Sequence, residues 1–488
     1  MKRRQFLTLS TAAAGVPLLG QCSSRASLQA QSSRSTSQGG LLDLALEARP
    51  VRAAIAGQSL NLLAYNGQIP GPMLEAKPGD TVQIRFKNGL TRETNLHYHG
   101  LHVPPTGNAD NVSIHVPPGE TQTYEFTIPE DHPAGTFWYH PHRHGLVADQ
   151  VFGGLAGLFV VRGKLDEIPE VKAAKEEFLV LQDFDAAGSS GWRGNPMMQM
   201  MGREGAIVTA NGQVNPSLSI PQGGLLRLRI LNASPSRFYL LSLEDHPMHL
   251  IATDGGAIPE PVELAEVLLT PGERIEVLVR GSRPPGQYRL LNKPYNRGGM
   301  GGMMGRGMMG RGMMGRGMMG RGMMGNPSNS NTTETLATLS YGESVQTVPL
   351  PKQLLPVEAL PEPVATQQFT LNHGMGRGRG MVFLINGQMF DPQRLDTRVK
   401  LGTVEEWEIT TTGTMDHPFH VHTNHLQVVS RNGRPMPYRA WKDTVLVSRG
   451  ETVRLRVPFR DFAGQTMYHC HILDHEDLGM MGILAIAG

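Results

Sequence analysis

Cysteine is nearly absent from this chain of 488 residues, which has only Cys22 and Cys470. Cys22 lies in a segment with the features of an export leader, so we expect the mature protein to keep Cys470 alone. A single cysteine excludes an intrachain disulfide and leaves a free thiol that can bind a metal ion. An excess of charge is also absent, since 45 Lys and Arg stand against 43 Asp and Glu. This balance gives no indication of nucleic acid or of an acidic surface as a partner.

Aromatic residues make up only 6% of the chain, whereas glycine occurs 58 times and proline 35 times. This composition favours short strands joined by turns over long helices. An Asn-Gly-Gln turn occurs three times, at 66–68, 211–213 and 386–388, and each is followed by two units of a turn and an alternating strand. Those units lie at 77–88 and 117–128, at 221–232 and 270–281, and at 400–410 and 448–459.

The threefold repeat predicts an all-β chain of three related antiparallel β-sandwich domains, because period-two alternation between Gly or Pro turns is typical of sandwiches. We place them at 41–165, 166–364 and 365–488. The second domain would contain a Met/Gly/Arg-rich insertion at 297–330 and a Pro-rich linker.

The chain begins MKRRQFLTLSTAAAGVPLLGQ, with Arg3 and Arg4 ahead of a weakly apolar run of small residues. That run is too short to span a membrane and is typical of a twin-arginine export signal. A Ser/Gln-rich linker follows, so the signal and linker together take up 1–40. We expect the twin-arginine export machinery as a partner, and a periplasmic or extracellular monomer without a membrane span.

The segment from Tyr468 to Met481 reads YHCHILDHEDLGMM and concentrates soft and imidazole donors. Cys470, His475 and Met480 are three of the four donors of a blue-copper electron-transfer site, which has two histidines, one cysteine and a weak axial methionine. Neighbouring side chains of a strand point to opposite faces, so His469 and His471 would face a second metal site. Taken alone, the tripeptide is equally compatible with a zinc site or an inert buried cysteine.

Three further histidine motifs favour copper: LHYHGLH at 96–102, WYHPHRHG at 138–145 and HPFHVH at 417–422. The two histidines of a His-x-His pair share one face of a strand and can meet adjacent metal ions. The middle repeat has HPMH at 246–249, but no cysteine follows it. We expect His246 and His249 to be surface residues and not ligands.

With all four histidine motifs in the same order, the chain resembles three-domain bacterial multicopper oxidases of the laccase and cuprous-oxidase branch. The repeats carry this resemblance from about residue 45 to the carboxyl terminus. It implies three tandem cupredoxin-like Greek-key β-sandwich domains and four copper ions: one type 1, one type 2 and a type 3 pair. O2 would be the oxidant, and the trinuclear cluster of type 2 and type 3 ions would lie between the first and third domains.

The resemblance also implies a role for each ligand. The type 1 ligands would be His417, Cys470 and His475, with Met480 axial; the type 2 ligands His97 and His420; and the type 3 ligands His99, His140, His142, His422, His469 and His471. Reduction of dioxygen to water consumes protons, so acids are needed near the cluster. Glu476 and Asp110 match the family's acids, although each could also be a solvated loop carboxylate. We expect Asp443 to lie in a turn or beside the ligands.

The implied activity couples one-electron oxidation of a substrate at type 1 copper to four-electron reduction of O2 to water. The substrate could be a phenolic compound, Cu(I) or another low-valent metal ion. The repeat at 300–325 holds eleven methionines, and thioethers prefer Cu(I) to hard ions. Met197, Met198, Met200 and Met201 add to this supply, and Asp416 could bind an incoming ion.

Other interpretations stay open. The protein could sequester Cu(I) through the methionines as a copper-tolerance protein, or the repeat could be a neutral expansion. A copper-free cell-division scaffold and a copper nitrite reductase are the alternatives from other classes. Both fit poorly, because the scaffold proteins have lost ligands and the nitrite reductases lack the His-Cys-His segment.

Overall fold

The computed structural model describes residues 33–186, 200–298, 332–376 and 380–488. These residues form an all-β molecule with three pairs of sheets, as the sequence predicts. None of the helices in the described ranges is long and apolar enough to cross a membrane. The predicted export signal, Met197, Met198 and the methionine repeat lie outside the described residues.

The first pair of sheets has the strand orders β3-β2-β5-β7 and β1-β4-β9-β8-β6. Its strands are β1 (Arg34–Thr36), β2 (Leu41–Ile55), β3 (Gln58–Tyr65), β4 (Gly71–Ala76), β5 (Thr81–Asn88), β6 (His97–His99), β7 (Thr121–Thr127), β8 (Gly135–His140) and β9 (Gly157–Val161), and its helix is α1 (Val147–Phe152). Alternate residues of β5, namely Val82, Ile84 and Phe86, are buried in the core between the two sheets.

The second pair has the orders β11-β10-β13-β18-β15-β16 and β12-β20-β19-β14-β17. It is preceded by helices α2 (Lys164–Glu167) and α3 (Pro169–Ala173). Its strands are β10 (Lys175–Phe184), β11 (Ile207–Ala210), β12 (Ser217–Gln222), β13 (Leu225–Asn232), β14 (Tyr239–Leu243), β15 (Met248–Thr253), β16 (Gly256–Leu264), β17 (Val267–Leu269), β18 (Arg274–Arg280), β19 (Gln287–Lys293) and β20 (Glu334–Ser344). Strands β19 and β20 pair antiparallel, and the methionine-rich insertion connects them.

The third pair has the orders β22-β21-β24-β30-β26-β27, with β28 beside β26, and β23-β32-β31-β25-β29. Its strands are β21 (Ala365–Gly376), β22 (Gly380–Ile385), β23 (Thr397–Lys400), β24 (Thr403–Thr411), β25 (His417–Val421), β26 (Leu426–Arg431), β27 (Arg434–Pro435), β28 (Trp441–Lys442), β29 (Thr444–Val447), β30 (Thr452–Phe459), β31 (Gly464–Cys470) and β32 (Met481–Ala487), and its helix is α5 (Leu473–Asp477).

The sheets are mixed, so the expectation of purely antiparallel sandwiches is wrong. Parallel pairs recur at matching places, β2 with β5, β10 with β13, and β21 with β24. Hydrophobic alternation reports which face of a strand is buried and carries no information on the direction of its neighbour. The recurrence itself supports the predicted internal repeat.

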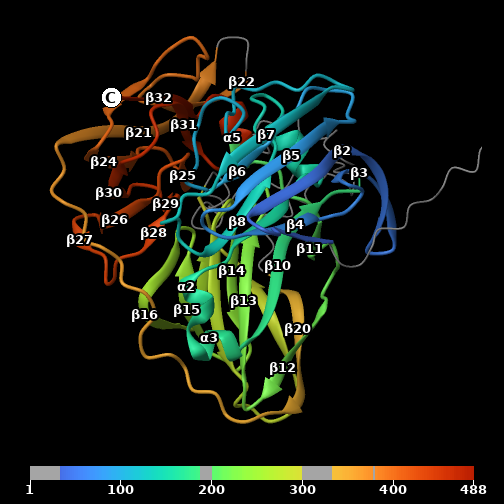
Figure 1. The fold of residues 1–488 in the computed structure, drawn as a ribbon. Helices are drawn as coiled ribbons and strands as arrows, with labels where there is room; N and C mark the ends of the chain where they lie inside the picture. The colour runs from blue at the N-terminus through green and yellow to red at the C-terminus, as the bar shows by residue number, and fades with distance from the viewer. Residues whose placement is uncertain (1–32, 187–199, 299–331, 377–379) are drawn as a thin grey trace, which may run out of the picture.

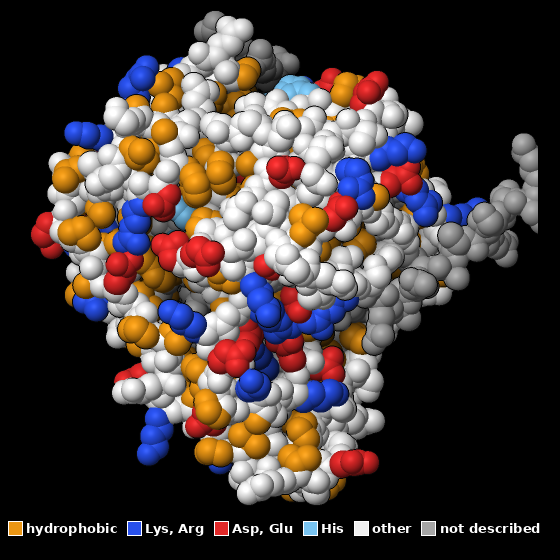
Figure 2. All heavy atoms as spheres, in the orientation of Figure 1, with side chains coloured by type: hydrophobic (Ala, Val, Ile, Leu, Met, Phe, Trp, Pro, Cys, Tyr) orange, Lys and Arg blue, Asp and Glu red, His pale blue; other side chains and the backbone are white. Residues whose placement is uncertain are grey.

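The first and third pairs of sheets lie side by side, and the second pair lies below them (Figure 1). A buried ionic network joins the first and second. Arg227 and Arg229 of β13 are 2% and 0% exposed, and both pair with Glu276 of β18. Thr136 of β8 donates a hydrogen bond to the same glutamate. Figure 2 shows positive and negative side chains intermixed on this side of the molecule, most densely near mid-height.

His246 and His249 are buried, so the expectation that they are surface residues is wrong. They are 5% and 7% exposed. The Nε2 atom of His246 lies 2.8 Å from the Tyr341 hydroxyl, and Nδ1 of His249 lies 3.3 Å from the Leu278 carbonyl oxygen. Neither belongs to a group of metal-binding side chains in the described part of the chain. The HPMH motif lies at the start of strand β15 of the second pair of sheets.

Candidate metal centres

The first cluster of donors joins the ends of two paired strands and a short helix. His417 begins β25, Cys470 ends β31 and His475 lies in α5. Cys470 Sγ lies 3.5 Å from His417 Nδ1 and 3.7 Å from His475 Nδ1, and the two nitrogens are 3.3 Å apart. All three side chains are fully buried. This triangle has the composition of a trigonal blue-copper site.

Met480 is held beside this triangle by its backbone. Its carbonyl oxygen accepts a hydrogen bond from the Cys470 N–H at 3.0 Å, and its own N–H donates to the His475 carbonyl oxygen at 2.9 Å. The side chain is fully buried in the same hydrophobic cluster as Cys470. The structure therefore brings His417, Cys470 and His475 together and holds the backbone of Met480 next to them.

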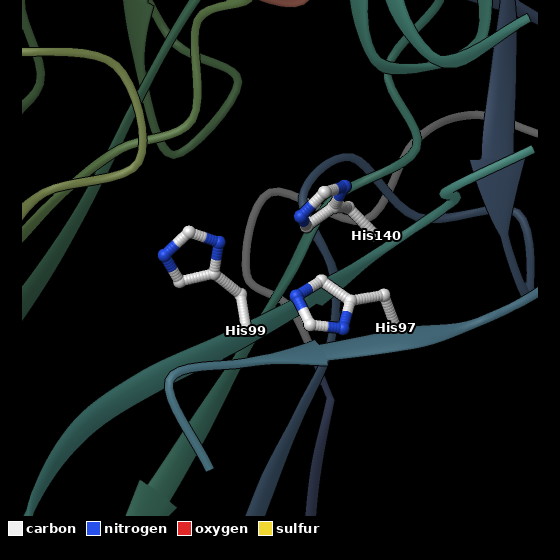
Figure 3. Close-up of side chains that lie close together, drawn as sticks. All are labelled: His97, His99 and His140. Atoms are coloured by element: carbon white, nitrogen blue, oxygen red, sulfur yellow. The ribbon is translucent and has the colours of Figure 1, made fainter. Parts of the chain in front are cut away.

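The second cluster gathers the other eight predicted histidines between the first and third pairs of sheets. His97 of β6 stands opposite His140 of β8, and His420 of β25 stands opposite His469 of β31. Figure 3 shows the rings of His97, His99 and His140 converging. The side chains that come within 4.8 Å of one another form the groups His97, His99 and His140; His97, His420 and His422; and His142, His422 and His469.

The free nitrogens of these rings fit metal ions. Seven buried ring nitrogens of this cluster have no hydrogen-bond partner: His97 Nε2, His99 Nδ1, His140 Nε2, His420 Nε2, His422 Nδ1 and both nitrogens of His471. A nitrogen of each of these rings would therefore be free to bind copper. In four of these rings the other nitrogen is engaged by a carboxylate or a carbonyl oxygen. The Nε2 atom of His469 lies 3.2 Å from that of His142 and 3.0 Å from that of His422. Buried unpaired acceptors are costly, so imidazoles arranged in this way indicate bound cations.

Comparison with known proteins identifies the family. Family models described as "Multicopper oxidase" match residues 47–166, 176–306 and 361–487. The solved structure of a multicopper oxidase from Campylobacter jejuni, described as a metallo-oxidase, is 32% identical, with 95% of each chain covered and a TM-score of 0.78. The chain belongs to the multicopper oxidase family. As such it is an oxidoreductase of the laccase-like or metallo-oxidase kind, which uses O2 and a reducing substrate.

Other relatives show how widely the family has diverged. Multicopper oxidase mco from Staphylococcus haemolyticus is 29% identical over 435 residues, covering 87% of this chain and 84% of the relative. Cell division protein FtsP from Xenorhabdus nematophila is 28% identical over 466 residues, covering 91% and 89%. A multicopper oxidase and a cell division protein have similar sequence identity to this chain. The function of this multicopper oxidase therefore has to be inferred from the residues of the site.

Burial holds the cluster histidines in their neutral form. It lowers the pKa of all ten below the usual value, to about 3 for His417 and to about 4 for His142 and His469. A metal ion requires a deprotonated imidazole. Both clusters are therefore ready to bind metal at neutral pH.

In the metal-free protein, the free energy of unfolding should decrease as pH is lowered from about 7 to about 4. The unfolded chain has histidines of ordinary pKa near 6.5 and takes up protons in this range, whereas the folded chain does so only near the lowered values. Burial raises the pKa of Asp110 to about 8, which acts in the opposite sense, but the ten histidines outnumber such carboxyls.

Calorimetric melting of metal-free protein at pH 8, 7, 6 and 5 measures this effect. The melting temperature should be highest at pH 8 and should decrease as the pH is lowered below 7. Copper-loaded protein is the control, because bound metal keeps the rings deprotonated and shifts the decline to lower pH. A midpoint that stays constant from pH 7 to pH 5 would show that the histidines are not buried as described.

Glu476 lies between two histidines of the second cluster. One oxygen is 3.1 Å from His469 Nδ1 and the other 3.5 Å from His142 Nε2. The carboxyl is fully buried, and neither oxygen has a hydrogen-bond partner. Burial raises the pKa of Glu476 above its usual value. A carboxyl with these properties can hold a proton and release it next to the cluster.

Asp110 is also buried and contacts His97 on the side away from the free Nε2 atom. Its oxygens lie 2.9 and 3.0 Å from His97 Nδ1, and one accepts the Tyr98 N–H at 2.9 Å. This contact orients His97 so that Nε2 faces the cluster. The structure thus places Asp110 on the outer side of His97, whereas Glu476 lies between the rings of His142 and His469.

Asp443 contacts two histidines of the second cluster. The sequence predicts that it lies either in a turn or beside the ligands. One carboxylate oxygen lies 2.9 Å from His99 Nε2, and the backbone carbonyl oxygen lies 2.9 Å from His420 Nδ1. Burial acts to raise the pKa of Asp443, but Arg274 and the histidines hold it well below its usual range. Asp443 is therefore an ionised acceptor for both rings.

Asp416 does not provide the open carboxylate suggested by its place beside His417. It is 2% exposed. One oxygen accepts a hydrogen bond from the Tyr295 hydroxyl at 2.8 Å, and the other accepts the Arg449 N–H at 2.9 Å. Its place in the sequence gave no indication of these two distant partners. With both oxygens engaged, Asp416 has a structural role beside the first cluster.

Proposed function

We propose that this multicopper oxidase binds four copper ions and couples the oxidation of Cu(I) to the reduction of O2 to water. The observation that carries the proposal is the continuity of the two clusters. Cys470 belongs to the first and its neighbour His469 to the second, and the ring of its other neighbour, His471, lies 4.9 Å from the ring of His99. Bound copper would supply a one-electron acceptor at the first cluster and a dioxygen-reducing centre at the second. The backbone of residues 469–471 joins the two centres covalently.

The ligand roles in this proposal are those that the family resemblance implies, and the free nitrogens support them. His417, Cys470 and His475 would hold the type 1 ion, with Met480 as the axial donor. His97 and His420 would hold the type 2 ion, and His99, His140, His142, His422, His469 and His471 would hold the type 3 pair. Asp110 and Asp443 keep His97, His99 and His420 oriented, and Glu476 delivers protons to the cluster.

The groups that cover His475 support a small substrate. The ring is fully buried, and its Nε2 atom lies 2.9 Å from the carbonyl oxygen of Met200. Phe383 stacks on the ring with centroids 3.8 Å apart and planes at 15°. A bulky phenol has no open edge of this imidazole to contact, which favours a small substrate such as a metal ion.

The surroundings favour Cu(I) in particular. Met200, Met201 and Met415 form a buried cluster with Met381 packed against it. The register of β21 and β22 sets His373 opposite Phe383 and Met375 opposite Met381. Paired residues share a face of the sheet. His373, Met375 and Met381 therefore lie on the same face as Phe383, the residue that covers His475. Thioethers and imidazole suit Cu(I), whereas Fe(II) prefers the carboxylate oxygens that Asp416 does not offer.

Export is part of the proposal and rests on the sequence alone. Arg3 and Arg4 precede a short run of small residues, the pattern of a twin-arginine signal. A periplasmic or extracellular oxidase of Cu(I) would act before the ion reaches the cytoplasm. The methionine repeat at 300–325 would add soft donors near the second domain.

Replacing Met381 and Met415 together by leucine should lower kcat/KM for Cu(I) by about tenfold or more. Leucine keeps the volume of the cluster but removes two soft donors, and tenfold corresponds to about 1.4 kcal/mol of lost binding. Ferrocyanide, a small donor that binds no thioether, serves as the second substrate. The measured quantity is the ratio of the two kcat/KM values.

Met248→Leu is the matched control, because Met248 is fully buried in the core of the second domain, away from both clusters. It should leave the ratio unchanged. If the double variant also kept the ratio of the unaltered enzyme, the methionines would not bind the substrate, and the proposal of Cu(I) would fail while the oxidase activity stood.

A further inference from the structure

Arg274 of β18 is a fully buried arginine whose hydrogen bonds reach all three pairs of sheets. Its two terminal nitrogens donate to the two Asp443 oxygens at 2.9 and 2.6 Å. The Nε atom donates to the Thr136 carbonyl oxygen at 2.9 Å, and the remaining N–H groups donate to the carbonyl oxygens of Gly272 and Asp254, each at 3.0 Å. All five donors of the guanidinium are therefore used.

The sequence marks this position as exceptional. The turns that open the corresponding strands read PPGET at 117–121 and SRGET at 448–452, whereas the second repeat reads TPGER at 270–274. Arg274 thus stands where the other two repeats have Thr121 and Thr452. The second pair of sheets contributes no side chain to the metal-binding groups of the described residues, yet it contributes this arginine.

The second repeat also lies directly against the second cluster. A Cβ atom on Gly272 would come within 2.9 Å of the His471 ring, and one on Gly100 would come within 2.2 Å of an Arg274 terminal nitrogen. Both glycines have positive φ, at +84° and +83°. The absence of side chains at these two points lets the arginine and the histidines approach each other closely.

We propose that Arg274 is a positioning residue of the second cluster, acting through Asp443 on His99 and His420. The fork of two hydrogen bonds fixes the plane of the carboxylate, which then accepts the Nε2–H of His99 and leaves its Nδ1 lone pair free for metal. The same residue places its backbone carbonyl oxygen to accept the Nδ1–H of His420, which leaves Nε2 free. Asp443 therefore sets opposite tautomers in the two rings, and Arg274 of the second domain holds Asp443 in place. This inference rests on the proposed copper sites.

Arg274→Lys tests the proposal. Lysine keeps the charge but is a single point donor and cannot form the fork. Loss of a partner that orients a ligand typically lowers metal affinity 10–100-fold. We expect the variant to lose copper from the second cluster to a chelator at a concentration at which the unaltered protein keeps four ions, with an altered type 2 electron paramagnetic resonance spectrum. The blue absorption of the first cluster should persist.

Arg229→Lys is the matched control, because Arg229 is equally buried in the same domain and pairs with Glu276, away from Asp443. Equal copper retention in both variants would overturn the inference. A failure of the unaltered protein to bind four ions would instead overturn the proposed function.

A second measurement needs no substitution. In the metal-free, unaltered protein, the nitrogen chemical shifts of the labelled imidazoles should show His99 protonated at Nε2 and His420 at Nδ1. The same tautomer in both rings would contradict the inference.

Discussion

Replacing Cys470 by serine is expected to abolish the blue absorption and to reduce dioxygen consumption to background. Cys470 is one of only two cysteines in the chain, and its sulfur lies within 3.7 Å of a ring nitrogen of both histidines of the first cluster. Strong blue colour requires a copper–thiolate bond, which a hydroxyl cannot replace. The buried site would still accept serine sterically, so the fold should persist. Absorption spectra and oxygen-electrode traces of copper-loaded protein measure both effects.

Met480→Leu is the matched control for this substitution. Met480 is equally buried, but it would be the weak axial donor, which tunes the potential more than it defines the bond. The leucine variant should stay blue and keep measurable turnover. A Cys470→Ser protein that remained blue and active would overturn the assignment of the first cluster.

Glu476→Gln should lower kcat on the order of 10²-fold while leaving the blue colour unchanged. Glutamine has the same shape but cannot release a carboxyl proton, and a positioned acid typically contributes 10²–10⁴-fold. Because Glu476 lies 3.1 and 3.5 Å from rings of the second cluster, its loss should affect the reduction of dioxygen and spare the oxidation of substrate. Single-turnover measurement of each half-reaction separates the two steps.

Glu362→Gln provides the control, since Glu362 pairs with Arg456 with its side chain 87% exposed. It should match the unaltered enzyme in both half-reactions. If Glu476→Gln slowed the oxidation of substrate and left dioxygen reduction intact, the proton-delivery role would be wrong.

The sequence predicted the parts of this site that depend on local spacing. In a His-x-His pair on a strand, the two rings lie on the same face. In the His-Cys-His segment, the two histidines point to one face and the cysteine points to the opposite face. Both clusters could therefore be outlined from four short motifs. Strand direction could not be predicted, because alternation is the same in parallel and antiparallel neighbours.

Contacts between distant segments also escaped prediction. Asp443 lies 344 positions from His99, and Met200 approaches His475 with a backbone carbonyl group that any residue would provide. Asp416 accepts a hydrogen bond from the hydroxyl of Tyr295, which lies 121 positions earlier in the chain. Such contacts are set by how whole domains pack, and no local pattern encodes that packing.

The ratio of Cu(I) oxidised to O2 consumed tests most directly whether this protein is a four-electron oxidase. Four Cu(I) ions, one O2 and four protons give four Cu(II) ions and two waters. Purified, copper-loaded protein should therefore oxidise four Cu(I) ions per O2 and release no hydrogen peroxide, with the spontaneous reaction subtracted. Binding of Cu(I) without oxygen uptake would indicate the copper-sequestering alternative, and a ratio of two with peroxide released would contradict a working trinuclear cluster.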